Sequence, residues 1–334
     1  MAPSVRTAFL TGGSGLVGSH VARELLARGW RVKALLRRPD RPNLLPAGCQ
    51  VVPGELTDAD SYRLAMAGCD VVLNVAGLTY GRTLAEFRHV NVGGAEALAR
   101  AAAQECPDSM LIHVSSQAAA GPSLDGRPRN EEDRPRPISW YGQSKLEGEQ
   151  AIGYYHRGPW CVIRPSVVYG PGDPGMVELF RIVARGIAPI IAEGKQRLQL
   201  LAAGDLARIV LAAACRPDLH GRRGFVAGDT ASSGDVVRCL AGMRSPPAVL
   251  VNVPRWAVRL AGAVVAVQQA VTGRTALFNE DKVREMLTAD WLCEPGPFLR
   301  QLGISGLTPW KAGLEATCRW YVQERWVSPR FVVV

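Results

Sequence analysis

Glycines recur at every third position in one short stretch near the start of the chain, between an apolar run and an amphipathic segment. They are Gly12, Gly15 and Gly18. A strand, a glycine turn and a helix in this order give a tight turn, a backbone open to close approach and a free helix N-terminus, which together bind a pyrophosphate. The glycines alone could arise by chance, so the flanking strand and helix carry the argument. We therefore predict dinucleotide binding at this turn, with Ser14 and Leu16 beside the glycines.

The first 170 residues alternate short apolar runs with helical segments. The expected strands are residues 7–10, 31–36, 50–53, 70–75, 111–115 and 160–164. Two long helices are expected at residues 17–28 and 86–104. Strands that alternate with helices form βαβ units, which build a parallel sheet with helices on both faces. We predict an α/β protein, a Rossmann-type doubly wound parallel sheet with a smaller, mixed C-terminal substrate domain.

A cluster of glycine and proline at residues 170–175 marks a domain boundary, and the regular alternation loosens after it. We predict a dinucleotide-binding domain at residues 1–172, which regains a strand and a helix from about 204–230, and a substrate-binding region at residues 173–334. The second region holds Trp256, Trp291, Trp310, Trp320 and Trp326. Such tryptophans usually pack in a core, and the alternative is an apolar substrate pocket.

Composition and charge narrow the class of protein. The chain has 334 residues, of which 47% are hydrophobic and 21% charged, as is typical of a folded globular protein. The net charge of +9 comes mainly from scattered arginines without a nucleic-acid-binding motif, so no nucleic-acid partner is expected. The dispersed cysteines and histidines predict no metal site. Neither a signal peptide nor an apolar stretch of membrane-spanning length is visible, so we expect a cytoplasmic protein without a membrane span.

The end of the second predicted strand bears on the choice of cofactor. An acidic residue about 20 positions after the glycines would bind the ribose 2′-hydroxyl of NAD, but this chain has Arg37 and Arg38 there. Two guanidinium groups favour NADP, whose 2′-phosphate they could hold, with NAD as the second choice. The alternative is that both arginines are solvated charges. Asp58, after the third strand, could accept the adenine amino group or stabilise a helix start. Leu56 and Ala76 complete the predicted cofactor set.

Tyr141 and Lys145 are four positions apart at an expected helix start, so their side chains share one face. An ammonium group beside a phenol lowers the pKa of the phenol and makes it a usable acid or base. The pattern would occur only about 0.1 times by chance here, which makes it more informative than the glycines. Ser115 and Ser116 follow an earlier strand, where a hydroxyl would face the ligand crevice. Either serine could instead cap a helix.

Five motifs along the chain occur together in one known family. They are the T-G-x-x-G-x-x-G turn, residues 74–77, the paired serines, Y-x-x-x-K and residues 164–173. By these motifs the chain resembles the extended short-chain dehydrogenase/reductase family over essentially its whole length. That family includes NAD-dependent epimerase/dehydratases, 3β-hydroxysteroid dehydrogenases and dihydroflavonol reductases. The resemblance implies a small-molecule substrate and is compatible with a homodimer through the long helices of the first domain.

The resemblance also gives each reacting residue a role. It implies that Ser116 holds the substrate oxygen, that Tyr141 is the general acid/base, and that Lys145 binds the nicotinamide ribose and tunes the tyrosine. Asn91 resembles the helix asparagine associated with a proton-relay water.

Departures from the family pattern narrow the subclass. Sugar-nucleotide members often carry an arginine where this chain has Leu198, although the neighbouring Arg197 could compensate. The residues after Ser116 lack the carboxylates of sugar dehydratases, and residues 164–166 resemble the steroid and flavonol reductases.

We therefore expect an NAD(P)-dependent oxidoreductase that moves a hydride between nicotinamide and a carbonyl or hydroxyl carbon of a hydrophobic small molecule. One alternative is a nucleotide-sugar epimerase with tightly bound NAD. The other is a non-catalytic NADP-binding sensor or assembly subunit, against which the complete Ser116, Tyr141 and Lys145 set counts.

Overall fold

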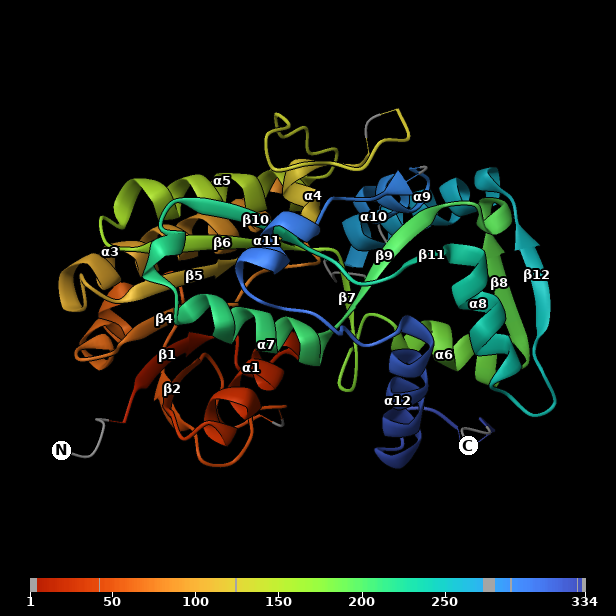
Figure 1. The fold of residues 1–334 in the computed structure, drawn as a ribbon. Helices are drawn as coiled ribbons and strands as arrows, with labels where there is room; N and C mark the ends of the chain where they lie inside the picture. The colour runs from red at the N-terminus through yellow and green to blue at the C-terminus, as the bar shows by residue number, and fades with distance from the viewer. Residues whose placement is uncertain are drawn as a thin grey trace.

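Seven parallel strands form the central sheet (Figure 1). A computed structural model describes residues 5–41, 43–123, 125–272, 280–288, 290–328 and 330–331. The strands are β1 (Thr7–Thr11), β2 (Arg31–Leu36), β3 (Gln50–Pro53), β4 (Val71–Asn74), β5 (Met110–Val114), β6 (Trp160–Pro165) and β10 (Arg222–Val226). Their order is β10-β6-β5-β4-β1-β2-β3, and every neighbouring pair is parallel. The order reverses between β1 and β4, the point where such sheets bind ligands at the carboxyl ends of their strands.

Helices cover both faces of this sheet, as the alternating pattern predicts. One face packs under α1 (Leu16–Ala27), α7 (Ala203–Ala214) and α11 (Gly296–Gln301), and the other under α3 (Gly94–Glu105) and α5 (Trp140–Tyr155). Figure 1 shows α3 and α5 above the sheet and α1 and α7 below it. The predicted doubly wound α/β fold is confirmed.

One predicted helix differs from the structure. The sequence predicts a continuous helix at residues 86–104, but α2 (Leu84–Arg88) is followed by a π-helical turn, His89–Gly93, before α3 begins. The side-chain amide of Asn91 is hydrogen-bonded to the backbone of Leu78 instead of facing solvent, and Gly93 and Gly94 lie where the turn meets α3. Turns of this type cluster at functional sites, and apolar periodicity carries no signal for them. The six strands predicted from the sequence all occur, with ends displaced by at most one residue.

The rest of the chain forms a smaller, mixed part, on the right in Figure 1. A four-stranded sheet joins β7 (Val167–Tyr169), β9 (Arg197–Ala202), β11 (Thr230–Ser232) and β13 (Asp290–Trp291), and a two-stranded sheet joins β8 (Ile187–Ile191) and β12 (Val249–Val253). The helices here are α6 (Val177–Ala184), α8 (Ser233–Gly242), α9 (Arg255–Thr272), α10 (Glu280–Met286) and α12 (Trp310–Gln323). The domain division predicted after residue 172 stays a prediction.

The tryptophans of this part divide into two kinds. Trp291 is buried, and Trp310, Trp320 and Trp326 pack at the edge of the smaller core, in line with the expectation of core packing. Trp256, on α9, is instead 67% exposed, so neither core packing nor a closed pocket accounts for it. None of the helices in the described part of the chain is both long and apolar enough to span a bilayer.

A buried ion pair fixes α5 on the sheet. Glu149 of α5 has no exposed surface and accepts two hydrogen bonds from the Arg164 guanidinium of β6, at 2.9 and 2.7 Å. The hydroxyl of Ser115, which follows β5, donates to the same carboxylate at 2.6 Å. A buried charge is stable only when it is paired and hydrogen-bonded in this way. The contact therefore joins the helix that carries Tyr141 to the ends of two central strands.

Replacement of Glu149 by alanine leaves the Arg164 guanidinium buried without its partner. We expect the free energy of unfolding to fall by about 3–5 kcal/mol, measured by urea denaturation at neutral pH. Glu147→Ala on the same helix is the matched control, because its pair with Arg88 at 2.6 Å is partly exposed and surface pairs contribute about 0–1 kcal/mol. Equal losses in the two variants would contradict the structural role of the buried pair.

Candidate active site

The glycine turn after β1 is shaped by two close approaches. Gly12 has a φ of +73°, and a Cβ there would lie 2.6 Å from the amide nitrogen of Ala76. A Cβ at Gly18 would lie 2.1 Å from the carbonyl oxygen of Gly12. Both positions therefore exclude every residue with a side chain. Gly15 and Ser14 are exposed at the tip of the turn.

The first turn of α1, which opens at Leu16, carries no acidic residue, and no side chain among the described residues caps it. The N–H groups at this helix start thus have no side-chain cap, and the positive end of the helix dipole lies behind them. An anion binds well in such a place.

Polar side chains lock the neighbouring strand end against the turn. The Thr11 hydroxyl accepts hydrogen bonds from the amides of Val75 and Ala76 at 3.2 and 3.1 Å and donates to Asn74 at 2.9 Å. Asn74 in turn donates to the ring of His113 at 3.0 Å. Burial lowers the pKa of His113 well below its ordinary value, which suits this accepting role. The backbone at Ala76 is thereby fixed beside Gly12.

Arginines line a hollow of about 280 Å³ next to this turn. Its lining residues are Ser14, Leu36, Arg37, Arg38, Arg41 and Asn43. Arg37 lies 3.7 Å from the Glu55 carboxylate, a loose contact between exposed side chains. Neither Arg38 nor Arg41 forms an ion pair with any other residue that the structure describes. Two cations are therefore available to an anionic ligand in the hollow.

Arg41 was not part of the predicted cofactor set. The segment after β2 folds back on the glycine turn, with the amide of Leu44 3.4 Å from the carbonyl of Ser14, and brings Arg41 beside Arg38. Three arginines within five positions were the available signal in the sequence.

Asp58 and Leu56, after β3, differ in exposure. Asp58 is exposed, and its carboxylate makes no capping bond to the short 3-10 helix that follows within the described residues. Leu56 is buried against Gly94, so its side chain serves packing. Asp58 is thus free to contact a ligand, whereas Leu56 could do so only through its backbone.

Ser116 and Tyr141 meet through their hydroxyl groups. Ser116 caps α4 (Gln117–Ala120), because its hydroxyl accepts from the Ala118 amide at 3.1 Å. The same hydroxyl lies beside the phenol of Tyr141 and acts to lower the pKa of that phenol. Ser116 is thus a helix cap that stands beside the tyrosine, and its role in holding a substrate oxygen stays a prediction.

Lys145 is buried one turn after Tyr141 on α5. Its ammonium donates to the carbonyl of Val114 at 2.8 Å, and burial lowers its pKa to about 8 while the nearby Glu149 carboxylate opposes that change. The lysine thus lies at the carboxyl end of β5 and beside the loop after β4, because a Cβ at Gly77 would be 3.6 Å from its Nζ.

The cation facing the Tyr141 ring is Lys282 of α10. Its Nζ lies 5.4 Å from the centroid of the Tyr141 ring, 5.8 Å from that of Tyr80 and 2.7 Å from the Glu285 carboxylate. Burial raises the pKa of Tyr141, and the Lys282 ammonium and the Ser116 hydroxyl act in the opposite direction. Glu285 and Tyr80 add smaller upward contributions to that pKa.

Two acidic residues of α10 also hold the start of α5. The Asp281 carboxylate accepts from the amides of Trp140 and Tyr141 at 2.8 and 3.2 Å. Ser139 accepts from the Gly142 amide at 3.0 Å and donates to Glu285 at 2.6 Å. Sequence reasoning missed α10 entirely, because its residues lie about 140 positions from Tyr141. No local motif marks such a contact.

Asn91 is occupied by the chain itself. Its Oδ1 accepts from the Leu78 amide at 2.7 Å, and its Nδ2 donates to the Leu78 carbonyl at 3.0 Å and to the Ser144 hydroxyl at 2.8 Å. Both of its N–H donors are thereby used. In this arrangement Asn91 holds the loop after β4 against α5, and the proton-relay role stays a prediction.

Several features fit a dinucleotide along the carboxyl edge of the sheet. The open helix start of α1 and the arginine hollow suit phosphates, and Gly12 allows close approach. Gln117 Nε2 and Ser166 Oγ, which follow β5 and β6, are buried without a hydrogen-bond partner among the residues described. Unpaired buried polar atoms of this kind require a partner such as a ligand. No group of three or more metal-ligating side chains occurs in the described ranges.

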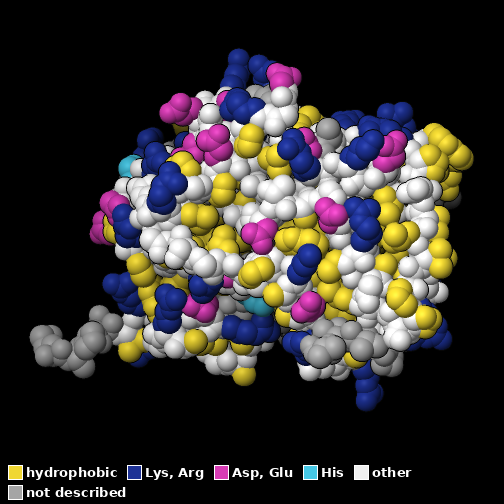
Figure 2. Space-filling view, turned by 45° about the vertical axis from the view of Figure 1, so that its right-hand side comes forward, with side chains coloured by type: hydrophobic (Ala, Val, Ile, Leu, Met, Phe, Trp, Pro, Cys, Tyr) yellow, Lys and Arg dark blue, Asp and Glu magenta, His cyan; other side chains and the backbone are white. Residues whose placement is uncertain are grey.

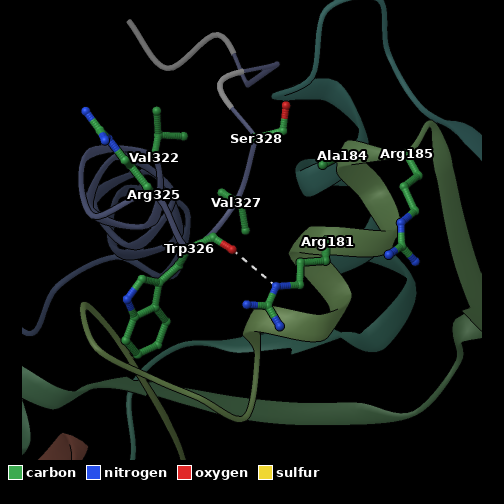
Figure 3. A pocket seen from close by; sticks show the side chains of 8 residues that line it. All are labelled: Arg181, Ala184, Arg185, Val322, Arg325, Trp326, Val327 and Ser328. Atoms are coloured by element: carbon green, nitrogen blue, oxygen red, sulfur yellow. Dashed lines mark hydrogen bonds between the residues drawn. The ribbon is translucent and has the colours of Figure 1, made fainter. Parts of the chain in front are cut away.

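A larger hollow, of about 690 Å³, lies in the smaller part of the molecule (Figure 3). It opens between α6 and the segment after α12, where Arg181 donates to the carbonyl of Trp326 at 3.2 Å. Its lining residues are Arg181, Ala184, Arg185, Val322, Arg325, Trp326, Val327 and Ser328. It shares none of these with the predicted site.

Comparison with known proteins gives consistent relatives. The family model described as "NAD dependent epimerase/dehydratase family" matches residues 8–228. The chain is 30% identical over 327 residues to a ceramide reductase of Caulobacter vibrioides (strain NA1000 / CB15N), covering 97% of this chain and 96% of that one. It is 35% identical over 187 residues to the 4-hydroxy-2-methyl-3-oxo-4-farnesyl-3,4-dihydroquinoline-1-oxide ketoreductase of Stigmatella aurantiaca, covering 52% and 54%.

Among solved structures, a UDP-glucose 4-epimerase of Thermotoga maritima aligns with a TM-score of 0.78 at 18% identity. The alignment covers 96% of this chain and 99% of that chain. This likeness concerns the fold alone.

Lys282→Met removes the cation beside the Tyr141 ring. Because that cation lowers the pKa of Tyr141, we expect its loss to raise the pKa further. With Tyr141 as the predicted general base, alcohol oxidation requires its phenolate. The rise of kcat/KM for alcohol oxidation with pH should therefore move to higher pH.

Two controls accompany the pH profile. Lys282→Arg keeps the charge and should keep the profile, and Lys311→Met makes the same chemical change at an exposed lysine. An unchanged profile in a folded Lys282→Met protein would show that another group sets the pKa.

Proposed function

We propose that this chain reduces a ketone on a lipid-like molecule with NADPH. The chain belongs to the NAD dependent epimerase/dehydratase family and is an NAD(P)-dependent oxidoreductase of the extended short-chain dehydrogenase/reductase type. The observation that carries the proposal is the Ser116–Tyr141 hydroxyl pair with the Lys282 ammonium beside it. A ketone oxygen needs this combination of an orienting hydroxyl and a proton donor.

Each residue of the site has a separate task in this reaction. When bound, the nicotinamide supplies the hydride that adds to the carbonyl carbon. Tyr141 gives its phenolic proton to the carbonyl oxygen, which becomes the alcohol, and Ser116 holds that oxygen in place. Lys145 binds the nicotinamide ribose from the carboxyl end of β5, and Lys282 stabilises the phenolate that Tyr141 leaves behind.

The arginine hollow supports NADP over NAD. The 2′-phosphate of NADP is an exposed dianion, and Arg38 and Arg41 offer it charge-assisted hydrogen bonds without first breaking an ion pair. The ribose 2′-hydroxyl of NAD prefers a carboxylate, and none lines the hollow. Ser14 and the open start of α1 receive the pyrophosphate, and the exposed Asp58 receives the adenine amino group.

The relatives support a lipid-like substrate. One is named for ceramide and the other for a farnesyl-bearing ketone. The first match spans 97% of this chain, including the smaller part in which we place the substrate, whereas the second match covers 52%. We propose that the substrate of this chain shares the feature common to both names, a reducible group on a long apolar molecule.

A nucleotide-sugar epimerase is the weaker candidate. Leu198 stands at the position where such enzymes often carry an arginine for the pyrophosphate. Arg197, which could have replaced it, is held by the Asp290 carboxylate at 2.6 Å on the neighbouring strand. A sensor that binds NADP without turnover would have no use for the Ser116–Tyr141 pair.

Tyr141→Phe removes the proton donor and leaves the ring. We expect kcat for NADPH-dependent ketone reduction to fall by about 10²- to 10⁴-fold, with the Kd for NADPH nearly unchanged in a fluorescence titration. Tyr154→Phe is the matched control, because it makes the same change at the other, exposed end of α5. Full activity in Tyr141→Phe would refute the proposed role.

Arg38→Ala and Arg41→Ala test the cofactor. Each should raise the Kd for NADPH about tenfold, the effect of one lost charge-assisted hydrogen bond, and leave the Kd for NADH almost unchanged. Arg28→Ala, at the far end of α1, should alter neither constant. An equal rise in the Kd values for NADPH and NADH would mean that the arginines do not bind the 2′-phosphate.

A further inference from the structure

The outer side of α9 exposes a row of large apolar side chains. Trp256, Leu260, Val264 and Val267 are 67%, 57%, 58% and 65% exposed. Their spacing of three and four residues places them on one side of the helix. A surface helix of a globular protein normally turns such a row toward the core, so this one is unpartnered in the described structure.

Apolar side chains are also exposed on β12, which directly precedes α9. Val249, Leu250 and Val251 are 67%, 46% and 43% exposed. We call the four α9 residues the apolar face. Figure 2 shows hydrophobic side chains gathered on the right-hand side of the molecule, the side on which β12 and α9 lie in Figure 1.

The inner side of α9 is already packed. Val258 is buried, and a Cβ at Gly262 would lie 2.7 Å from Val283 of α10. The apolar face is thus the side of the helix that points away from the protein, and it cannot close onto the core without breaking this packing.

Positive charges border the apolar face. Arg255 and Arg259 are both exposed on α9, and the helix contains no acidic residue. Glu193 interacts with Arg255 but is paired with Lys195 at 2.5 Å. The border therefore keeps an excess of positive charge. An apolar row with a tryptophan and flanking arginines matches the composition of helices that lie in the surface of anionic membranes.

The apolar face lies one helix away from the reacting groups. Val283 of α10 packs on α9, while Asp281 and Lys282 of the same helix contact the start of α5 and the Tyr141 ring. A surface held at α9 is therefore mechanically linked to the candidate active site.

We propose that the apolar face docks on an anionic lipid bilayer, from which the enzyme takes its lipid-like ketone. The choice of a bilayer over a second copy of this chain rests on charge, because two such faces would bring arginines together without acidic partners on α9. The supply of substrate rests on the proposed function, whereas docking itself depends only on the face and its charges.

Vesicle binding tests the docking. We expect the purified chain to sediment with phosphatidylcholine vesicles that contain phosphatidylglycerol, to bind pure phosphatidylcholine vesicles much less, and to detach as salt rises. Leu260→Gln combined with Val264→Gln should weaken binding at least about tenfold. Leu64→Gln, which changes a leucine that is 69% exposed on the dinucleotide-binding side, should not.

Arg255→Gln combined with Arg259→Gln should reduce binding to the anionic vesicles and leave binding to pure phosphatidylcholine unchanged. Failure to bind anionic vesicles, or equal binding by the Leu260/Val264 variant, would overturn the proposal. So would a dimer, seen by analytical ultracentrifugation, that this variant converts to monomer, since a second copy would then be the occupant.

An activity assay separates docking from catalysis. The Leu260/Val264 variant should reduce a water-soluble ketone at the normal rate and a ketone embedded in anionic vesicles at least about fivefold more slowly. Loss of activity on the vesicle-embedded ketone alone supports delivery from the membrane. Absence of NADPH oxidation with every ketone, together with intact vesicle binding, would refute the proposed reductase function but not the proposed docking surface.

Discussion

The candidate site depends on one buried carboxylate. Glu149 is fully buried and accepts hydrogen bonds from Arg164 and Ser115, which lie at the ends of adjacent strands. Since an unpaired charge in this place would be costly, α5 can adopt only the register that brings Glu149 to these donors. Lys145 lies one turn before Glu149, and Tyr141 one turn before that. The structural ion pair therefore determines the position of both candidate catalytic side chains relative to the sheet.

A second constraint comes from the other end of the chain. The Asp281 carboxylate accepts hydrogen bonds from the backbone amides of Trp140 and Tyr141. The positive end of the α5 dipole at this place favours a negative charge. Lys282 and Glu285, on the same short helix, face Tyr141 and Ser139. Helix α5 is thus held on the sheet by Glu149 and at its start by α10. The smaller part of the molecule thereby completes the surroundings of the tyrosine.

Much of the fold was accessible from the sequence, because parallel strands and their covering helices leave regular apolar runs. The pairing of Ser116 with Tyr141 was also accessible, since each carries a local signal, a strand end and a helical spacing. Arg41 and Lys282 were not, because only the folded chain brings them to the glycine turn and to the phenol. The π-helical turn at Asn91 could not be predicted from the sequence for a related reason. Hydrogen bonds of the Asn91 side chain to the backbone of Leu78 determine this turn, and apolar periodicity does not report them.

Opposing influences act on the pKa of Tyr141. Burial raises the pKa of the phenol, and the contributions of Lys282 and Ser116 reduce that rise without cancelling it. A phenol with a raised pKa keeps its proton near neutral pH, so it is ready to donate to a carbonyl oxygen. Without the cation the phenol would be a weaker acid, and proton transfer would lose driving force. A buried phenol beside an ammonium therefore suits the acid/base role that we propose for Tyr141, and the ammonium belongs to a lysine in the smaller part of the molecule.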